Sequence, residues 1–431
     1  MKKTSQFPDM RHTCGWNSLL PQRNSAPPLN ESIRCDVAII GAGYTGIAAA
    51  RRLAQLAPDC DVVLVDSATI GEGNAGRNSG FLLEVALAHD VDTENIARMR
   101  QCNELLKATM DALRADVESH RIDCDLVRSG TYRAAAGPEG QTSLQRYAAF
   151  LETAGLPFES LDKSALATRI GTTFYQQGLY SPHCYLVQPA ALIRGLVNLL
   201  PPRARLFERT PALSITRSKA QWQLHTPKGK ITASQVIVAN NAFCKGLGLA
   251  GERIAAMYTY AALTEPLPPA LLSQCGEDAQ WGVLPAHRLG STLRRTADGR
   301  LLVRSLYGYE REVELGAVTN KLREALARRY PHLKDVAFAS VWGGATGFTY
   351  NAAPIWGELK PGLFISAGCN GGGVVKGTLF GKLLAEKMLG QESADVTALF
   401  GRASRMPPEP FRRLGFRIIS ALERRKARAE V

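Results

Sequence analysis

Long hydrophobic runs are missing from this chain of 431 residues. No apolar stretch approaches the ~18 residues that a membrane-spanning helix requires, so we expect no transmembrane segment. The start, Met1-Lys2-Lys3, is basic, but no apolar segment follows it, and we therefore expect no signal peptide.

Paired cysteines and chemically grouped histidines are also missing. The nine cysteines are scattered and no two stand at C-x-x-C spacing, which argues against a zinc or redox motif. An odd number of scattered cysteines in a long chain is typical of a reducing compartment, so we expect a cytoplasmic location. None of the seven histidines forms a recognisable arrangement with Ser or Cys. His183 lies nearest a predicted domain crossing, where a structural role is the commoner one.

The composition excludes a disordered chain. Hydrophobic residues make up 45% and charged residues 21%, which is enough apolar surface for a packed core. The length suggests about two or three domains. The net charge is +13, and residues 402–431 carry much of it. A basic balance permits RNA or a membrane surface as a partner, although a solvated basic surface is commoner.

Order is expected to begin after a polar, proline-bearing arm over 1–29. A short apolar run at 35–40, a helical segment at 44–57 and a second apolar run at 61–65 predict a β-α-β unit. Further helices are expected over 93–120, with Asp92 or Thr93 as N-cap, and over 138–153, 189–200 and 374–389. Further strands are expected over 126–136, 221–239 (a hairpin), 258–263, 301–305, 337–342 and 363–367.

A glycine motif joins the first predicted strand to the helix. Gly41, Gly43 and Gly46 form G-x-G-x-x-G, with Tyr44 and Thr45 between the last two, and Asp66 ends the second strand. The first glycine permits the tight turn, the second lets the backbone approach a pyrophosphate, and the third lets helix and strand pack closely. Asp66 would accept hydrogen bonds from the ribose hydroxyls. The motif predicts a dinucleotide but leaves NAD and FAD open.

A second glycine-dense segment, 71–81, follows the second strand. Gly73, Gly76 and Gly80 give backbone access, and Arg77 and Asn78 offer polar groups, beside a cofactor. Such a loop can pass close to a large planar ligand.

These motifs, with others further along the chain, resemble those of the FAD-dependent amine and amino-acid oxidoreductases related to D-amino-acid oxidase and sarcosine oxidase. The chain is most similar to the branch of γ-glutamylputrescine oxidase. That branch has G-A-S-G-R-N-G-G where residues 73–80 read GNAGRNSG. Further matches are VIVANNA (236–242), DGRLL (298–302), Trp342-x-Gly344, T-x-N-x-x-P (349–354) and AGCNGGG (367–373). The resemblance covers about residues 30–425.

The resemblance implies an α/β fold: a Rossmann-like FAD-binding domain, interrupted by a mixed-sheet substrate domain of α+β type. We expect the FAD-binding domain over 30–122, 183–255 and 337–431, and the substrate domain over 123–182 and 256–336. It also implies the following FAD-contacting residues: Gly41, Gly43, Tyr44, Thr45, Gly46, Asp66, Gly73, Gly76, Arg77, Asn78, Ser79, Gly80, Ala212, Ala239, Asn240, Gly344, Gly368, Asn370, Gly371, Gly372, Gly373 and Val374.

Departures from the family pattern bear on the cofactor. Gly344 stands where covalent sarcosine oxidases have the flavin-linking cysteine, so we expect non-covalent FAD. Asn351 replaces a usual Asp, and Leu186-Val187-Gln188-Pro189 replaces His-x-His-Pro. Segment 368–373 would point a helix N-terminus at the flavin, whose reduced form that dipole could stabilise. Lys376 resembles the lysine that promotes oxygen reaction in some relatives, with its register shifted by one residue. Cys369 is expected to be a small buried hydrophobe.

The substrate pocket is expected around Arg304, which replaces a glycine of the family pattern. An arginine there could hold a substrate carboxylate bidentately, or form an ion pair at the surface instead. Tyr258 and Tyr260 alternate on one strand and should face one side. Tyr307 and Tyr309 would lie in the neighbouring loop.

The implied reaction is oxidation of a C–N bond, with hydride transfer from the α-carbon to flavin N5 and hydrolysis of the imine. Oxygen or another acceptor would then reoxidise the flavin. Two alternatives stay open: oxidation of a hydroxyl, which needs a general base such as a pocket His, and an RNA-acting oxidoreductase, which needs a basic stripe leading to the flavin.

The tail, 411–429, predicts a basic amphipathic helix. Phe411, Leu414, Ile418 and Leu422 recur at helical spacing. Such a helix can lie on an anionic membrane, but packing of the apolar stripe on its own domain is commoner.

Overall fold

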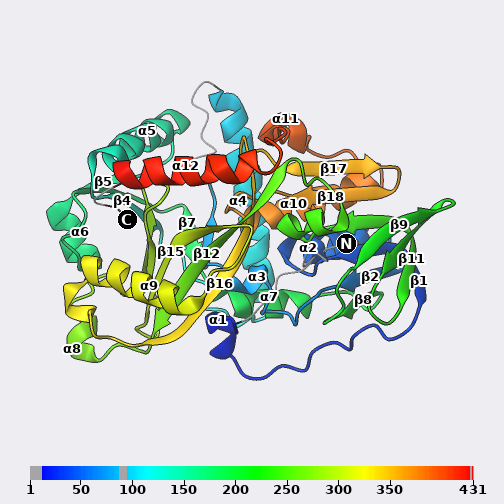
Figure 1. The fold of residues 1–431 in the computed structure, drawn as a ribbon, viewed down its shortest axis with the longest axis horizontal. Coiled ribbons are helices and arrows are strands. Elements are labelled where there is room, and N and C mark those ends of the chain that lie inside the picture. The colour runs from blue at the N-terminus through cyan, green and yellow to red at the C-terminus, as the bar shows by residue number, and fades with distance from the viewer. Residues whose placement is uncertain (1–11, 87–94, 428–429, 431) are drawn as a thin grey trace.

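The computed structural model describes residues 12–86, 95–427 and 430, in which two eight-stranded sheets stand side by side (Figure 1). The first sheet has the order β17-β18-β11-β1-β2-β8, and a hairpin extends it from β11. Its strands are β1 (Ile33–Ile40), β2 (Val62–Val65), β8 (Ala204–Phe207), β9 (Ser214–Ser218), β10 (Gln221–His225), β11 (Lys230–Val238), β17 (Ile355–Lys360) and β18 (Leu363–Ala367).

The centre of the first sheet is parallel and buried on both faces, as its continuous apolar runs predict. Ile40 pairs with Val238 on β11 and with Val65 on β2. The predicted β-α-β unit is confirmed as β1, α2 (Tyr44–Leu56) and β2. One face is covered by helices α2, α4 (Ile96–Ser119), α7 (Pro189–Val197) and α10 (Val375–Met388). The N-cap predicted at Asp92 or Thr93 lies outside the described residues, and Asn95 caps α4.

The second sheet is mixed and has the order β16-β12-β15-β14-β13-β4-β6-β5. Its strands are β4 (Thr131–Ala135), β5 (Glu159–Asp162), β6 (Gln177–Ser181), β12 (Ile254–Thr264), β13 (Trp281–Pro285), β14 (Thr292–Arg295), β15 (Leu301–Tyr309) and β16 (Phe338–Thr349). A short ribbon pairs β3 (Phe81–Leu83) with β7 (Cys184–Leu186). The remaining helices are α1 (Gly15–Ser18), α3 (Asn74–Arg77), α5 (Pro138–Ala154), α6 (Lys163–Ile170), α8 (Pro269–Leu272), α9 (Leu315–Arg329), α11 (Val396–Phe400) and α12 (Phe411–Lys426).

The segment 337–431, expected in the first domain, is divided between the two sheets. Strand β16 pairs with β12 along its length and so belongs to the second sheet. Strands β17 and β18 belong to the first sheet. Helix α12 contacts the second sheet's side of the molecule, because Glu423 forms an ion pair with Arg288 and its Oε2 lies 3.4 Å from His287 Nε2. The sheets therefore place β16 with the second sheet, while the division into domains at 337 stays a prediction.

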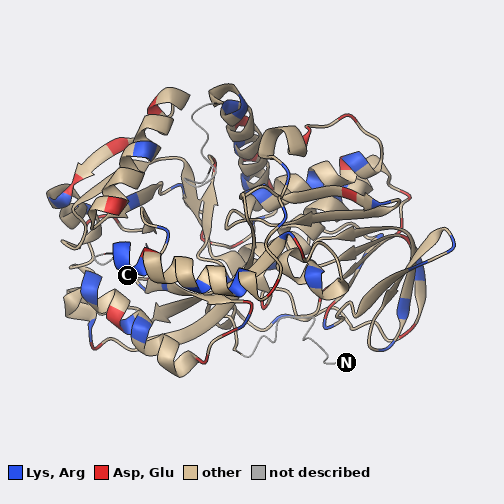
Figure 2. Cartoon of the chain, turned by 45° about the horizontal axis from the view of Figure 1, so that its top comes forward, with Lys and Arg blue, Asp and Glu red and all other residues tan. Residues whose placement is uncertain are grey.

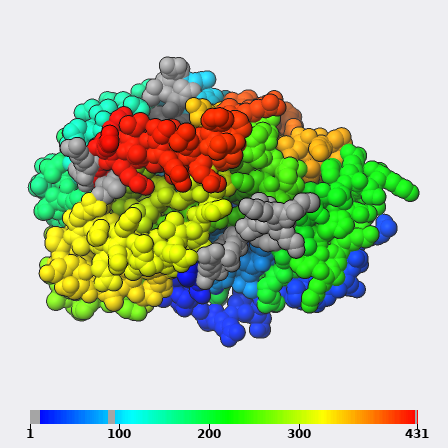
Figure 3. All heavy atoms as spheres, in the orientation of Figure 1, coloured from blue at the N-terminus to red at the C-terminus, as the bar shows by residue number. Residues whose placement is uncertain are grey.

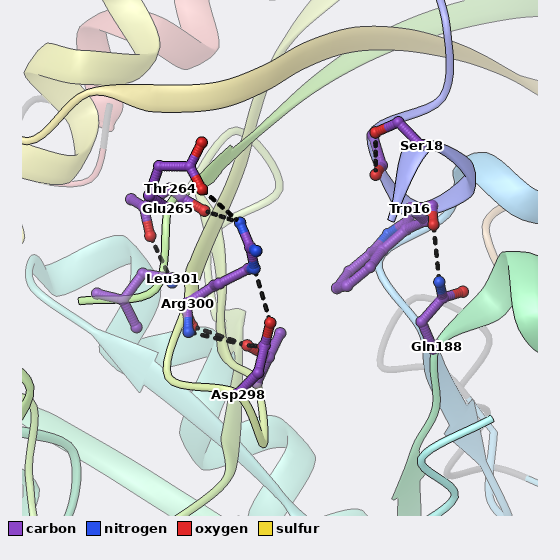
Figure 4. Close-up of polar contacts among 10 residues, drawn as sticks. Trp16, Ser18, Gln188, Thr264, Glu265, Asp298, Arg300 and Leu301 are labelled. Carbon is purple, nitrogen blue, oxygen red and sulfur yellow. Dashed lines mark hydrogen bonds and ion pairs between the residues drawn. The ribbon is translucent and has the colours of Figure 1, made fainter. Parts of the chain in front are cut away.

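The N-terminal arm is not wholly extended. Helix α1 buries Cys14 and Trp16 at its start. In Figure 4, Gln188 points toward Trp16, and its Nε2 donates to the Trp16 carbonyl oxygen at 2.7 Å. Gln188 Oε1 also accepts from the amide of Ala191 and thereby caps α7. The side-chain amide of Gln188 thus makes two structural hydrogen bonds, which gives a local reason for glutamine at this position in place of the family's histidine.

The apolar stripe of the C-terminal helix is exposed, so the prediction that it packs on its own domain is wrong. Phe411, Leu414, Ile418 and Leu422 are each more than half exposed. The helix instead contacts the molecule through other positions, such as Phe416, whose ring stacks on Tyr309. Within the described residues, no helix is both long and apolar enough to cross a bilayer.

Candidate active site

A cavity of about 1120 Å³ lies where the carboxyl ends of the parallel strands meet the second sheet. Its wall includes the residues that follow β1, β2, β11 and β18, together with one face of β12, β14 and β15. Ligands of open α/β sheets bind at this edge, outside the carboxyl ends of the strands.

The three glycines of the first motif have separate physical tasks. Gly41 has φ +102°, and a Cβ there would lie 2.9 Å from the Ala239 carbonyl oxygen, so only glycine fits the turn. A Cβ on Gly46 would lie 1.9 Å from the Gly41 carbonyl oxygen, because helix and strand touch there. A Cβ on Gly43 would meet only the Ala75 methyl, at 3.7 Å. Gly43 therefore leaves space toward the cavity rather than toward the protein.

Two helix N-termini open into this space. Helix α2 begins after Gly43 and α10 after Val374, and neither first turn is capped by a side chain. Both ends line the cavity. The helices are in close contact, because a Cβ on Gly381 would lie 2.1 Å from the Thr45 carbonyl oxygen. Uncapped amides and the positive ends of two helix dipoles make this region suited to a pyrophosphate.

Asp66 lies at the end of β2, on the cavity wall. Its two carboxylate oxygens accept from the amides of Ala42, at 2.9 Å, and Ala68, at 3.0 Å. Burial raises the pKa of Asp66, although these amide bonds act in the opposite direction. Each oxygen retains acceptor capacity, which is what the ribose hydroxyls of a dinucleotide would require.

Arg77 lines the cavity, but its guanidinium holds the glycine-dense loop together. It donates to the carbonyl oxygens of Glu72, at 2.6 Å, Gly343, at 2.9 Å, and His12. The expectation that Arg77 offers its charge to the cofactor is therefore corrected: the group ties the loop to β16 and to the N-terminal arm. Asn78 likewise donates to the Ala75 carbonyl oxygen.

Arg294 also holds the glycine-dense loop, and the sequence analysis did not identify it. It is buried, lies over the Trp16 ring and donates to the carbonyl oxygens of Ser79 and Val187. Burial lowers the pKa of Arg294 to about 10, so the side chain stays charged near neutral pH. A Cβ on Gly80 would lie 2.1 Å from Nη1 of Arg294, so a residue larger than glycine would displace the Arg294 guanidinium.

Five of the glycines expected to contact the cofactor do not line the cavity. A Cβ on four of them would lie within 3 Å of a neighbouring protein atom, and only Gly344 has ordinary contact distances; the five are Gly46, Gly76, Gly80, Gly344 and Gly368. The other residues expected at the cofactor do line it: Gly41, Gly43, Tyr44, Thr45, Asp66, Gly73, Arg77, Asn78, Ser79, Ala212, Ala239, Asn240, Asn370, Gly371, Gly372, Gly373 and Val374.

Three further positions singled out in the sequence also line the cavity. Lys376 is buried in the first turn of α10, next to Gly377, which approaches Thr45 of α2. This position next to α2 favours a role for Lys376 at the phosphate end of the site over one at the substrate end. Asn351 accepts from the Ser404 amide and donates to the Arg402 carbonyl oxygen, and an Asp could not make the second bond. Cys369 is half-buried and its Sγ accepts from Asn241 Nδ2.

Tyr258 and Tyr260 share one face of β12, as predicted, but it is the face turned away from the cavity. Both pack in the core beneath α9, where the Tyr260 hydroxyl accepts from the Val313 amide. Their expected place in the substrate pocket is therefore wrong. Met257, Thr259 and Ala261, which alternate with them, line the cavity instead.

Arg304 lies on β15 and faces the cavity. Among the described residues it makes no ion pair or hydrogen bond through its guanidinium, whose carbon lies 5.5 Å from the centre of the Tyr307 ring. Tyr307 in turn donates to the Arg288 carbonyl oxygen. An unpaired cation on a cavity wall is suited to a negatively charged ligand.

His287 is the histidine that the fold brings to the cavity among the described residues, and no sequence pattern indicated it. Its Nδ1 accepts from the Leu289 amide at 3.1 Å, and its Nε2 lies 3.4 Å from Glu423 Oε2. Both ring nitrogens are therefore engaged with protein groups. His183, in contrast, does not line the cavity; it lies 3.8 Å from Glu84, and burial lowers its pKa.

The residues present fit a flavin dinucleotide. The cavity exceeds the roughly 300–1,000 Å³ of ordinary small-molecule sites, and Gly43 provides a cradle that a larger side chain would fill. The Asn240 Oδ1 atom is buried on this wall and finds no hydrogen-bond partner among the described residues. Uncapped helix ends, Asp66 and the loop over 73–80 supply the contacts that phosphates, a ribose and a planar ring system each need.

Comparisons with known proteins agree with this geometry. The sequence model of the family described as FAD dependent oxidoreductase matches residues 36–387. The chain is 28% identical over 407 residues to the gamma-glutamylputrescine oxidoreductase of Escherichia coli (strain K12), covering 89% of each chain. It is 28% identical over 393 residues to a probable oxidoreductase OrdL of Rhizobium meliloti (strain 1021), covering 88% of each. The crystal structure of glycine oxidase from Geobacillus kaustophilus superposes with a TM-score of 0.73 at 24% identity, over 87% of this chain and 100% of that one.

Proposed function

The chain belongs to the family of FAD-dependent oxidoreductases, and from this premise we propose that it oxidises the C–N bond of an amine that carries a carboxylate. Relatives named for glycine and for γ-glutamylputrescine oxidation support an amine or amino acid as substrate class. The observation that carries the carboxylate is Arg304, an unpaired guanidinium on the cavity wall among the described residues. We also propose that FAD is held without a covalent bond, because Gly344 stands at the position of the linking cysteine in covalent relatives.

Bound FAD supplies a two-electron acceptor for the hydride that leaves the substrate's α-carbon. The residues of the chain supply position and charge. Arg304 would hold the carboxylate. Thr259 and Thr292 offer hydroxyl groups on the same wall of the cavity. Trp342 and Ala261 form an apolar part of that wall. Loss of the hydride leaves an iminium, which water hydrolyses to a carbonyl compound and the protonated amine, or ammonium for a primary amine.

Asp66 lies at the dinucleotide end of the cavity, and the other carboxylate and the histidine that the described residues place on its wall are both engaged with protein groups. His287 has both nitrogens engaged, and Glu423 forms an ion pair with Arg288 and lies next to His287 Nε2. An amine needs no such base once it binds uncharged, because its nitrogen lone pair drives hydride loss. An alcohol does need one, so this arrangement favours the amine over the hydroxyl substrate.

Anaerobic reduction of the holoenzyme tests the proposal. Amino acids and N-alkyl amino acids should bleach the flavin absorbance, whereas the matched amines without a carboxylate should react more slowly and 2-hydroxy acids not at all. Bleaching by hydroxy acids alone would replace the proposal with alcohol oxidation. Equal rates for amino acids and simple amines would show that the substrate needs no carboxylate and would contradict that part of the proposal.

A further inference from the structure

A second arginine stands on the same cavity wall as Arg304. Arg133 of β4 is buried at 7% exposure and lines the cavity. Its guanidinium carbon lies 4.4 Å from the centre of the Tyr147 ring, and its Nε is buried with no hydrogen-bond partner in the part of the chain that the structure describes. No carboxylate in the described part of the chain forms an ion pair with it. A buried, unpaired cation that opens onto a cavity is costly unless an anion joins it.

The two arginines lie in one row across the second sheet. Arg304 pairs with Thr292, Leu284 pairs with Arg133, and the register of β13 with β14 places Leu284 opposite Thr292. All four side chains line the cavity, whereas the alternating row of Val283, Leu293 and Val303 is buried in the core on the opposite face. Three strand spacings of about 4.8 Å separate the two arginine backbones, roughly 14 Å in all.

The two positions differ in their distance from the cofactor loop. On the other side of Arg304 the row continues to Ala261 and then Trp342, whose Nε1 donates to the Arg77 carbonyl oxygen. Arg304 is thus on the cofactor side of the row and Arg133 on the far side.

Resting on the function proposed above, we infer that the substrate is an amino dicarboxylate. Arg304 binds the carboxylate next to the oxidised carbon, and Arg133 binds a second carboxylate at the far end of the molecule. A substrate with one carboxylate would leave Arg133 without a counter-charge.

Ligand binding without turnover tests this inference separately from the reaction. The holoenzyme is titrated with straight-chain dicarboxylates of three to eight carbons and with the monocarboxylates of equal length, following the flavin absorbance. One charge-assisted contact corresponds to about ten- to a hundredfold in affinity. At the best length the dicarboxylate should therefore bind about ten- to a hundredfold more tightly than its monocarboxylate.

Arg133→Met should remove this preference and leave monocarboxylate binding unchanged. Arg133→Lys, which keeps the charge but loses the planar fork, should retain part of it and serves if Arg133→Met fails to fold. Arg146→Met, at an exposed position of α5, is the control for loss of one positive charge. Equal affinities in the wild type, or a Met variant that weakens both ligand series alike, would overturn the inference. A flavin that no amine bleaches would instead count against the proposed function.

The exposed face of α12 independently carries a second inference. Phe411, Leu414, Ile418 and Leu422 follow one another at intervals of three or four residues and are 51–64% exposed. The opposite side of the helix, including Phe416, Ser420 and Glu423, lines the cavity. Figure 3 shows α12 on the surface of the molecule, and in the described part of the chain its apolar stripe is left exposed.

Basic side chains flank this apolar stripe. The helix has six Lys or Arg against one Glu, and Figure 2 shows the basic positions along it. Arg413, Arg417 and Arg424 share a flank, and they are exposed and form no ion pair in the described part of the chain. Two copies of the helix would repel each other, whereas an anionic surface complements this charge. An apolar stripe beside a basic flank is the pattern of helices that lie in a membrane interface.

We propose that α12 docks on an anionic lipid surface. The full-length holoenzyme should sediment with vesicles of phosphatidylglycerol and phosphatidylcholine, and much less with phosphatidylcholine alone. At roughly fivefold per charge, the triple variant Arg413→Gln, Arg417→Gln, Arg424→Gln should bind about a hundredfold more weakly. Ile418→Asp should also weaken binding, through the apolar contact.

Three exposed lysines elsewhere provide the matched control. The triple variant Lys163→Gln, Lys321→Gln, Lys360→Gln loses the same charge and should retain most binding. Equal loss in both triple variants, or equal binding to neutral vesicles, would overturn the proposal. So would a dimer that Ile418→Asp dissociates in a protein without vesicle binding, since a second copy would then cover the stripe.

Discussion

Gly43→Val should fold and lose its FAD. A Cβ at position 43 would touch only the Ala75 methyl, at 3.7 Å, and the backbone φ of −82° suits any residue. The two methyl groups of valine would fill the space in which the pyrophosphate approaches the backbone. The purified variant should therefore be colourless, with a far-UV circular dichroism spectrum like that of the wild-type apoprotein.

The matched variants separate cofactor contact from packing. Gly316→Val, at an exposed glycine of α9 with nothing near its missing Cβ, should keep full flavin content. Gly46→Ala should instead compromise folding, because its Cβ would lie 1.9 Å from a carbonyl oxygen. A folded Gly43→Val protein with undiminished flavin would contradict the assignment of this turn. Loss of a ligand present at a hundred times its Kd also removes about 2.7 kcal/mol of stability, so the variant should melt at the temperature of the wild-type apoprotein.

Local sequence patterns predicted the first sheet well. The β-α-β unit, the glycine turn and Asp66 depend on residues within about thirty positions of one another, and each has its expected place. The pairing of β10 with β11 and the buried strand β18 were equally predictable from short apolar runs and a turn.

Roles set by distant partners could not be predicted. The guanidinium of Arg77 donates hydrogen bonds to carbonyl oxygens of residues 65 and 266 positions away in the sequence, and no local pattern indicates such partners. Alternation correctly placed Tyr258 and Tyr260 on one face of β12, but α9 decides that this face is core. Arg133 and Arg304 share one row of the second sheet only because β13 and β14 lie between their strands, and the sequence analysis predicted neither of these short strands. The helical pattern of α12 was recognised, whereas the exposure of its apolar stripe depends on which surface it meets.

Arg304→Ala should lower kcat/KM for a carboxylate-bearing amine by about ten- to a hundredfold, which corresponds to one charge-assisted contact of roughly 1.5–3 kcal/mol. Because the described residues form no ion pair with Arg304, the change should leave the fold and flavin content intact. Arg304→Lys should recover only part of the loss, since an ammonium cannot bind a carboxylate through two parallel hydrogen bonds.

The amide of the same substrate distinguishes a carboxylate clamp from a general effect on the cavity. With the amide, wild type and Arg304→Ala should differ little, because the charge that Arg304 would meet is absent. Tyr307→Phe keeps the ring beside the Arg304 guanidinium and removes only the hydroxyl that bonds to the Arg288 carbonyl oxygen, so it should leave the preference for acid over amide unchanged. If Arg304→Ala slowed acid and amide equally, Arg304 would shape the cavity rather than bind the carboxylate. Steady-state kinetics of the four acid and amide combinations therefore decides whether the cation on β15 selects an amino acid over a simple amine.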